Sequence, residues 1–160
     1  AAILAEILAL PSAAADRSAR VAWGGWQLRR FQDHLHLLAD AELTPLTVAR
    51  DWPPGTPPPD LGAWRLVAGP GDGSAEQPAL QLPEGLPLRL APARGGERLA
   101  LNGCHQRIAE LWRAAGVPPW RRRQWPLVYA GDDLIAVPGV AVADPWRDQP
   151  LTAWHLQPAS

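Results

Sequence analysis

The sequence predicts an α+β fold, in which a small mixed or antiparallel β domain with one principal helix follows a shorter region of helix and β-hairpins. Three observations support it. Hydrophobic residues make up 47% of the 160 residues and charged residues 19%, which is a globular composition. Short apolar runs lie between Gly- and Pro-containing turns, as in β-hairpins. Residues 105–116 carry apolar side chains at helical spacing.

The first ten residues predict a helix, because apolar side chains recur on one face: Ile3, Leu4, Ile7 and Leu8. Pro11 ends it. No N-cap residue precedes Ala1, so we expect that the chain begins inside a helix and that an N-terminal portion is missing.

Residues 20–38 predict strands, with a hairpin turn at Gly24-Gly25 and a second turn at Asp33-His34. Five prolines within residues 51–60 exclude regular structure there and predict a stiff connection. Residues 61–67 predict a strand and residues 69–78 a loop. We therefore expect two domains, residues 1–80 and 81–160.

The second half carries clearer signals. Alternating leucines on both sides of residues 93–96 predict a β-hairpin. The helix that follows has Asn102 as a candidate N-cap and Gly116 as its C′ residue, and its apolar stripe is formed by Ile108, Leu111, Trp112 and Ala115. Residues 126–144 predict two or three strands with a turn at residues 131–133, and residues 152–157 predict a strand that closes the sheet.

Charge and cysteine content narrow the classes of function. The net charge is −1, but residues 101–125 contain five Arg and one Glu, which suits a limited contact with phosphates. All 15 basic residues are Arg. The single Cys104 excludes an internal disulfide and a multi-cysteine zinc site, fits a reducing cytoplasm, and is expected to be buried or idle. No apolar run reaches about 18 residues, so no membrane span is expected.

A family resemblance follows from the last 75 residues. Residues 110–142, ELWRAAGVPPWRRRQWPLVYAGDDLIAVPGVAV, resemble the C-terminal domain of tRNA(Ile)-lysidine synthetases, also described as the cell-cycle protein MesJ family. Residues 19–38, ARVAWGGWQLRRFQDHLHLL, are similar to the family's central substrate-binding domain. The resemblance implies that residues 1–80 are part of that central domain with a Pro-rich connection, and that residues 81–160 are the C-terminal domain.

The resemblance also implies a function. The full bacterial enzymes use ATP to adenylate the wobble cytidine of tRNA(Ile) with a CAU anticodon, and lysine then displaces AMP to form lysidine. Their central and C-terminal domains hold the tRNA body. Their catalytic N-terminal domain carries an SGGxDS-type loop, which this sequence lacks. ATP and Mg²⁺ are therefore expected for that domain, whereas this chain is expected to be inactive alone, with no cofactor, metal or catalytic residue. The expected partners are this tRNA, the catalytic domain and, as an open alternative, a second copy of the chain.

Alternative sites are weaker. The Gly-rich residues 69–73 lack a following helix, a Ser and a basic residue, so they do not predict a phosphate loop. His34 and His36 share one strand face, but neither a cysteine nor a third histidine lies nearby to complete a metal site. Asp132 and Asp133 are explained by a turn between strands.

The candidate nucleic-acid contacts are arginines and a flanking tryptophan. Relatives often carry one Arg and two Lys near the start of the principal helix, whereas here only Arg107 is basic, which favours the Arg cluster after the helix. Arg107 and Arg113 lie off the apolar stripe, and the alternative is that they only solubilise the helix. The alternative for the cluster is a solvated turn with internal ion pairs. The full set is Arg29, Arg30, Arg107, Arg113, Trp120, Arg121, Arg122 and Arg123.

Two further expectations concern buried side chains. Side chains alternate along a strand, so one of Arg29 and Arg30 should face out and the other inward or sideways. A buried arginine would need a carboxylate, and Asp33 is close in sequence. Most of the nine tryptophans are expected in the core, namely Trp23, Trp26, Trp64, Trp112 and Trp154, whereas Trp120 and Trp125 are candidates for contact with a partner. The competing hypothesis is a non-catalytic protein-interaction or domain-packing module that uses a Trp-bearing surface without direct RNA contact. Salt dependence of RNA binding separates the two.

Overall fold

The computed structural model describes residues 20–74 and 76–159. The helix predicted over residues 1–10 lies outside the described residues. The chain forms two compact units, Ala1–Thr44 and Pro45–Ser160. We refer to them as unit 1 and unit 2 and describe each by itself.

Unit 1 contains a three-stranded antiparallel sheet of β1 (Arg20–Trp23), β2 (Trp26–Phe31) and β3 (His34–Ala39), followed by the 3-10 helix η2 (Asp40–Leu43). The Gly24-Gly25 turn is confirmed. Its φ angles of 50° and 85° are those of a two-residue hairpin turn that matches the twist of the strands. The second turn lies at Gln32-Asp33, one residue earlier than predicted, and both residues have positive φ.

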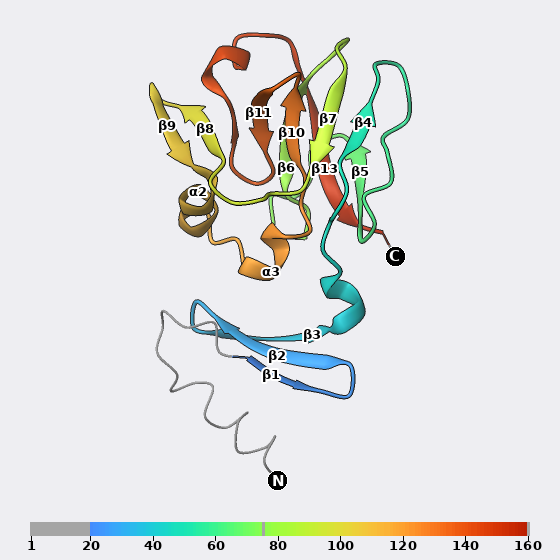
Figure 1. Ribbon diagram of the computed structural model, residues 1–160, viewed down its shortest axis with the longest axis vertical. Helices are drawn as coiled ribbons and strands as arrows, with labels where there is room; N and C mark the ends of the chain where they lie inside the picture. Colours follow the sequence, from blue (N-terminus) through green and yellow to red (C-terminus); the bar gives the residue numbers. More distant parts are fainter. Residues whose placement is uncertain (1–19, 75, 160) are drawn as a thin grey trace. The chain divides into compact units, whose positions relative to one another are not determined.

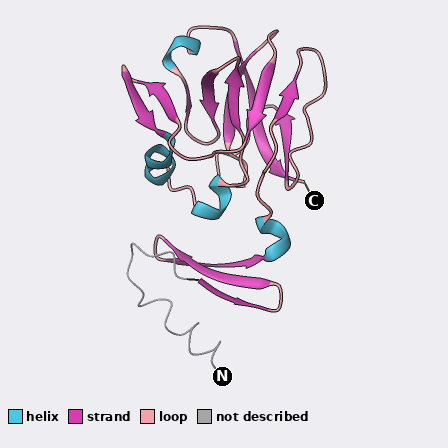
Figure 2. Cartoon of the chain, viewed as in Figure 1, coloured by secondary structure: helices cyan, strands magenta, loops and turns pink. Residues whose placement is uncertain are grey.

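Unit 2 is mostly antiparallel sheet with short helices (Figures 1 and 2), so the α+β prediction is confirmed. One sheet has the order β12-β11-β10-β7-β4, a second β5-β13-β6, and β8 pairs with β9. The elements are β4 (Arg50–Trp52), β5 (Trp64–Ala68), β6 (Ala79–Pro83), β7 (Leu88–Ala91), β8 (Arg98–Leu101), β9 (Cys104–Arg107), α2 (Ile108–Ala114), α3 (Pro119–Arg122), β10 (Leu127–Ala130), β11 (Asp133–Val137), β12 (Ala141–Val142), η3 (Asp144–Trp146) and β13 (Leu151–Pro158).

Long-range strand pairing joins residues 45–80 to the second half of the chain. β4 pairs with β7, and β5 pairs with β13. The compact division therefore falls after Thr44, whereas the division after residue 80 stays a prediction about the family's domains. The expectation that residues 51–60 hold no regular structure was wrong at its start, because Asp51 and Trp52 belong to β4.

The hairpin predicted around residues 93–96 was wrong. β7 pairs with β4 and β10, while β8 turns at Asn102-Gly103 and pairs with β9. Both turn residues have positive φ, 54° and 79°, which is the conformation of a two-residue hairpin. Asn102 is therefore a turn residue, and the helix N-cap is Arg107. Gly116 with φ 76° follows the helix, as predicted.

The strands after α3 follow the prediction more closely. β10 and β11 form a hairpin whose turn is Gly131-Asp132, and β12 adds a third strand. The last strand, β13, does not lie at an edge. It is the central strand between β5 and β6. Within the described part of the chain, no helix is long and apolar enough to cross a membrane.

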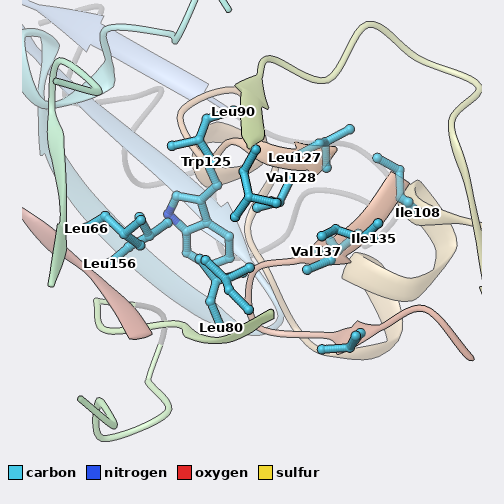
Figure 3. Packing of buried hydrophobic residues seen from close by; sticks show 14 of the residues in the cluster. Leu66, Leu80, Leu90, Ile108, Trp125, Leu127, Val128, Ile135, Val137 and Leu156 are labelled. Carbon is cyan, nitrogen blue, oxygen red and sulfur yellow. The ribbon is translucent and has the colours of Figure 1, made fainter. Parts of the chain in front are cut away.

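The core of unit 2 contains two of the five tryptophans predicted to be buried. Trp64 and Trp112 are 1% and 2% exposed, which confirms the prediction. Trp64 meets Trp125 edge-on, with ring centroids 6.0 Å apart. Figure 3 shows the Trp125 indole among core side chains, with its nitrogen on the side of Leu66 and Leu156.

Three tryptophans of the predicted core are less enclosed. Trp23 of unit 1 is half-buried. Trp154 is only half-buried and meets Trp52 edge-on, with ring centroids 5.0 Å apart. Trp26 was wrongly assigned to the core. Its side chain is 45% exposed.

Candidate nucleic-acid interface

Helix α2 has a buried apolar side, and arginines lie on its exposed side and just before its start. Ile108 and Trp112 are buried, and the Trp112 indole Nε1–H donates to the Pro138 carbonyl oxygen at 3.2 Å. Arg113 is exposed in the last turn of α2, and Arg107 is exposed where β9 meets the helix. The apolar stripe anchors the helix and leaves both guanidinium groups at the surface.

Helix α3 gives the three consecutive arginines different environments. Pro119 occupies its first turn, where the missing N–H has no cost. Successive side chains on a helix are rotated by about 100°. Arg121 therefore faces the interior, Arg122 is half-buried and Arg123, the C-cap residue, is exposed.

Arg121 makes internal contacts. Its Nη2–H donates to Glu76 Oε1 at 2.8 Å and its Nη1–H to Gln124 Oε1 at 3.1 Å. Its guanidinium carbon lies 5.3 Å from the centroid of the Trp64 ring. The side chain is 11% exposed, so these contacts give Arg121 a structural role in unit 2. Its predicted contact with RNA stays a prediction.

Arg122 and Arg113 bring two positive charges together. Arg122 donates from Nε to the Val117 carbonyl oxygen at 2.9 Å, which fixes its side chain after α2. Burial lowers the pKa of Arg122, and the positive charge of Arg113 lowers it further. Arg122 nevertheless stays protonated, because the ordinary pKa of arginine is so high. An anion between the two would relieve their repulsion.

A second pair of like charges lies on the β8–β9 hairpin. Arg98 is directly opposite Arg107 in the antiparallel register. Both side chains are exposed. Like charges directly opposite in a sheet are destabilising, so this pair indicates a use beyond folding. The sequence reasoning missed Arg98, because the predicted hairpin paired the wrong strands.

We call the following set the basic surface: Arg98, Arg107, Arg113, Arg122 and Arg123. They lie on β8, β9, α2 and α3 or, for Arg123, at the C-cap of α3, and these four elements follow one another along the chain (Figure 1). Among the residues that the structure describes, Arg107, Arg113 and Arg123 form no ion pair. The basic surface therefore presents guanidinium groups that are available to phosphates.

The tryptophans that flank the arginine cluster lie in the interior. Trp120 is 5% exposed and Trp125 is 1% exposed. Both have packing roles in unit 2. The contact of Trp120 with RNA stays a prediction, and the basic surface does not require it.

Arg29 and Arg30 belong to unit 1. The Arg30 side chain is 16% exposed and pairs with Asp33 at 3.2 Å, which is the carboxylate that the sequence offered as a partner. Arg29 donates from Nε and Nη2 to Gln27 Oε1 at 3.0 and 2.8 Å. These contacts hold both side chains, and their role with RNA stays a prediction.

The weaker candidate sites have plain structural explanations. The rings of His34 and His36 lie 6.4 Å apart, and His34 Nδ1 is 2.9 Å from the Gln32 carbonyl oxygen. Across residues 20–74 and 76–159, no three side chains of the metal-binding types gather into one group. Cys104 was expected to be buried or idle, and its side chain is exposed.

The Gly-rich residues 69–73 do not fit a triphosphate. The backbone N–H groups of Asp72 and Ser74 already donate to Gln77 Oε1 and Asp72 Oδ1, at 3.2 and 2.8 Å. Hydrogen bonds from Ser74 lower the pKa of Asp72, so the loop holds a charged carboxylate. This negative charge would repel phosphate, and no step with ATP is assigned to this chain.

The comparisons with known proteins agree with one another. Residues 88–157 match the family model described as the TilS substrate C-terminal domain, and residues 1–36 match the TilS substrate binding domain. The tRNA(Ile)-lysidine synthase of Legionella pneumophila (strain Paris) is 33% identical over 144 residues, which cover 88% of this chain and 32% of that protein. The enzyme of Serratia proteamaculans is 34% identical over 143 residues, covering 82% and 32%.

Two further matches are more local or more distant. The tRNA(Ile)-lysidine synthase of Chromobacterium violaceum is 53% identical over 55 residues, which cover 34% of this chain and 13% of that protein. A crystal structure of a TilS C-terminal domain aligns with a TM-score of 0.40 and 17% identity, covering 71% of this chain and 99% of that one. The chain spans about a third of the length of the first two relatives. With two domain models and these relatives in agreement, the chain belongs to the tRNA(Ile)-lysidine synthase family and matches its substrate-binding and C-terminal domains.

Proposed function

We propose that this chain binds the body of tRNA(Ile) with a CAU anticodon and positions it for a tRNA(Ile)-lysidine synthase. The basic surface carries the proposal, because four of its five arginines are exposed, and Arg107, Arg113 and Arg123 form no ion pair within the described residues. The family of the chain supplies the identity of the RNA. The adenylation and lysine-transfer steps, with their ATP and Mg²⁺, belong in this proposal to the catalytic domain of such an enzyme.

The chemistry of the basic surface suits the backbone of a folded RNA. Arginine donates two parallel hydrogen bonds to a phosphate, and such contacts are strong and geometrically defined. A-form RNA is recognised largely by shape and by its phosphates and 2′-hydroxyls. The Arg113–Arg122 and Arg98–Arg107 pairs are each under mutual repulsion, which a bound phosphate would relieve.

The proposed contribution to catalysis is orientation. Contacts to the tRNA body reduce the rotational and translational freedom of the bound RNA and bring the anticodon loop to the active site. No described side chain of this region needs to take part in bond chemistry. A cytoplasmic location, where tRNA is modified, belongs to the same proposal.

A second candidate function rests on unit 1. Leu35 and Leu37 are 47% and 58% exposed on the face of β3 that also carries Trp26 of β2. An exposed apolar sheet face of this kind is typical of a packing surface. Under this alternative the chain packs on its catalytic domain or on a second copy, and the basic surface makes no RNA contact.

Fluorescence anisotropy of labelled, unmodified tRNA(Ile) with a CAU anticodon tests the first candidate across a salt series. The variant Arg113→Ala/Arg123→Ala removes two exposed charges from the basic surface. A matched control, Arg50→Ala/Arg65→Ala, removes exposed arginines from β4 and β5. We expect saturable binding. The logarithm of the association constant should fall linearly with the logarithm of the salt concentration, with a slope of about 0.7–0.9 per phosphate contact.

The outcomes separate the candidates. RNA positioning is supported if the basic-surface variant binds the tRNA more weakly and with a smaller dependence on salt concentration, while the control variant binds as the wild-type chain does. Absence of binding at low salt, or equal loss in both variants, contradicts it and favours the packing module. In that case Trp26→Ser/Leu37→Ser should abolish association with the catalytic domain or with a second copy.

A further inference from the structure

A cavity next to the basic surface carries one further inference. It has a volume of about 410 Å³, within the range of about 300–1,000 Å³ that small-ligand sites occupy. We call it the hairpin cavity, because the β8–β9 hairpin forms one wall. Its lining residues are Glu97, Arg98, Ala100, His105, Tyr129, Asp132, Asp133, Leu134, Ala143, Pro145 and Trp146.

The walls of the hairpin cavity are tied together by Asp144. Its two carboxylate oxygens accept the backbone N–H groups of Asn102 and Gly103, at 3.0 and 2.8 Å. This clamp holds the tip of the β8–β9 hairpin against η3, which carries Trp146. β8 also lies beside β11 (Figure 1). Arg98 and His105 on one wall and Trp146 on the other are therefore placed before any ligand arrives.

The lining of the hairpin cavity combines aromatic rings with carboxylates that can accept hydrogen bonds from the edge of a nucleotide base. Tyr129 and Trp146 offer ring surface, and unpaired bases of RNA bind by stacking on such side chains. Asp132 and Asp133 are exposed carboxylates at the rim, and neither forms an ion pair within the described residues. Carboxylates accept hydrogen bonds from exocyclic amino groups, as in recognition of cytosine N4.

The charges on its lining favour the entry of one part of a nucleotide into the hairpin cavity. The carboxylates of Glu97, Asp132 and Asp133 outnumber the guanidinium of Arg98 on the lining, so the cavity repels a phosphate. Cations lie around it instead. The Arg89 guanidinium carbon is 4.8 Å from the centroid of the Tyr129 ring. A base inside with its phosphate outside matches this distribution.

We propose that the hairpin cavity binds the base of an unpaired nucleotide that carries an exocyclic amino group, namely cytosine, adenine or guanine. The inference rests on the proposed function for the identity of the ligand as RNA. The base stacks on Tyr129 and Trp146, and its amino group donates to Asp132 or Asp133. The phosphates on either side of this nucleotide contact Arg98 and its neighbours on the basic surface.

Nuclear magnetic resonance of the full, ¹⁵N-labelled chain tests the proposal with nucleosides, which lack phosphate. The Trp146 indole N–H resonance is assigned by comparison with Trp146→Phe. Cytidine and adenosine should shift this resonance at millimolar concentration, whereas uridine should bind about tenfold more weakly because it lacks the amino group. The variant Asp132→Asn/Asp133→Asn should lose this preference, because an amide both donates and accepts. Asp148→Asn, which lies outside the lining, should keep it.

Three other results overturn the cavity proposal. One is an unshifted Trp146 resonance with all three nucleosides. Another is an equal shift by uridine that the Asp132→Asn/Asp133→Asn variant leaves unchanged. A shift with a short lysine peptide instead of nucleosides would assign the cavity to a cationic protein side chain. Salt-dependent tRNA binding together with an unshifted Trp146 would remove only the cavity proposal. Nucleoside binding without any tRNA binding would remove the proposed positioning function and keep the cavity as a nucleoside site.

Discussion

The guanidinium carbon of Arg121 lies 5.3 Å from the centroid of the Trp64 ring, although 57 residues separate them in the chain. Glu76 and Gln124 accept hydrogen bonds from the same guanidinium. The first arginine of the cluster therefore stabilises the junction of α3 with the core, while Arg123 remains at the surface. This difference leads to the first prediction.

Arg121→Ala should lower the free energy of unfolding by about 2 kcal/mol, because it removes two hydrogen bonds and leaves Gln124 Oε1 with fewer donors in a buried site. Arg123→Ala should change it by less than about 0.5 kcal/mol. Urea denaturation followed by tryptophan fluorescence measures both. RNA affinity should show the reverse order once each variant is confirmed to be folded. Equal destabilisation by the two variants would contradict the structural role of Arg121.

A matched pair of core substitutions isolates one hydrogen bond. Trp112 and Trp125 are 2% and 1% exposed, but only the Trp112 indole has a hydrogen-bond acceptor, the Pro138 carbonyl oxygen. Both Trp→Phe changes remove similar volume. Trp112→Phe should therefore cost about 1 kcal/mol more than Trp125→Phe. Thermal unfolding of both variants, with the wild-type chain as reference, measures the difference, and an equal cost would argue against a contribution from this bond.

The Asp144 clamp should make stability depend on pH in acid. Hydrogen bonds from Gly103 and Asn102 are the main causes that lower the pKa of Asp144 below the ordinary value of 3.8. The unfolded chain therefore binds this proton more readily than the folded one. The stabilisation is fully present above the ordinary pKa, and it is lost as pH falls through the lowered one.

Asp144→Asn should therefore be less stable than the wild-type chain at pH 7, and the difference should shrink below about pH 4. Urea midpoints between pH 7 and pH 3 measure it. Asp148→Asn, which changes an exposed carboxylate, serves as the control and should show no such dependence. A difference between Asp144→Asn and wild type that stays constant across this range would contradict a clamp that acts through the charged carboxylate.

Arg98 and Arg107, which lie opposite each other in the β8–β9 hairpin, predict a trade-off between fold stability and tRNA binding. Arg98→Gln relieves the repulsion with Arg107 and should stabilise the fold by a few tenths of a kcal/mol, about 0.2–0.5. The same change should weaken tRNA binding and lower the salt slope by about 0.7–0.9, one phosphate contact. Thermal unfolding and anisotropy on the same samples measure both effects. Arg65→Gln on β5 is the control, and weaker stability with unchanged binding would contradict the assignment of Arg98.

Short-range patterns predicted the local elements well. The Gly24-Gly25 hairpin and the helix stripe of Ile108 and Trp112 follow from residues close to each other in the chain. The arrangement of strands in unit 2 did not follow in the same way. The strand at Leu88–Ala91 looked like one arm of a local hairpin, yet it lies between β10 and β4. Alternation shows that a segment is a strand and does not show which strand pairs with it.

At the candidate site, too, the sequence identified local features but not their contacts with distant residues. The sequence marked the arginine cluster as a unit, whereas the structure gives Arg121, Arg122 and Arg123 three different environments. Arg98 carried no local signal, since its significance depends on Arg107 across the β8–β9 ladder. The hairpin cavity was likewise invisible, because its walls come from segments that span residues 97–146.

By itself, the sequence determined the α+β class, the family and the concentration of arginine after residue 100, because each depends on composition or on residues near one another. Only the tertiary structure decided which arginines are available and which are held inside. The reason is physical: the direction of a side chain is set by its partners, and Glu76 for Arg121 and Asp144 for Gly103 lie more than forty residues away.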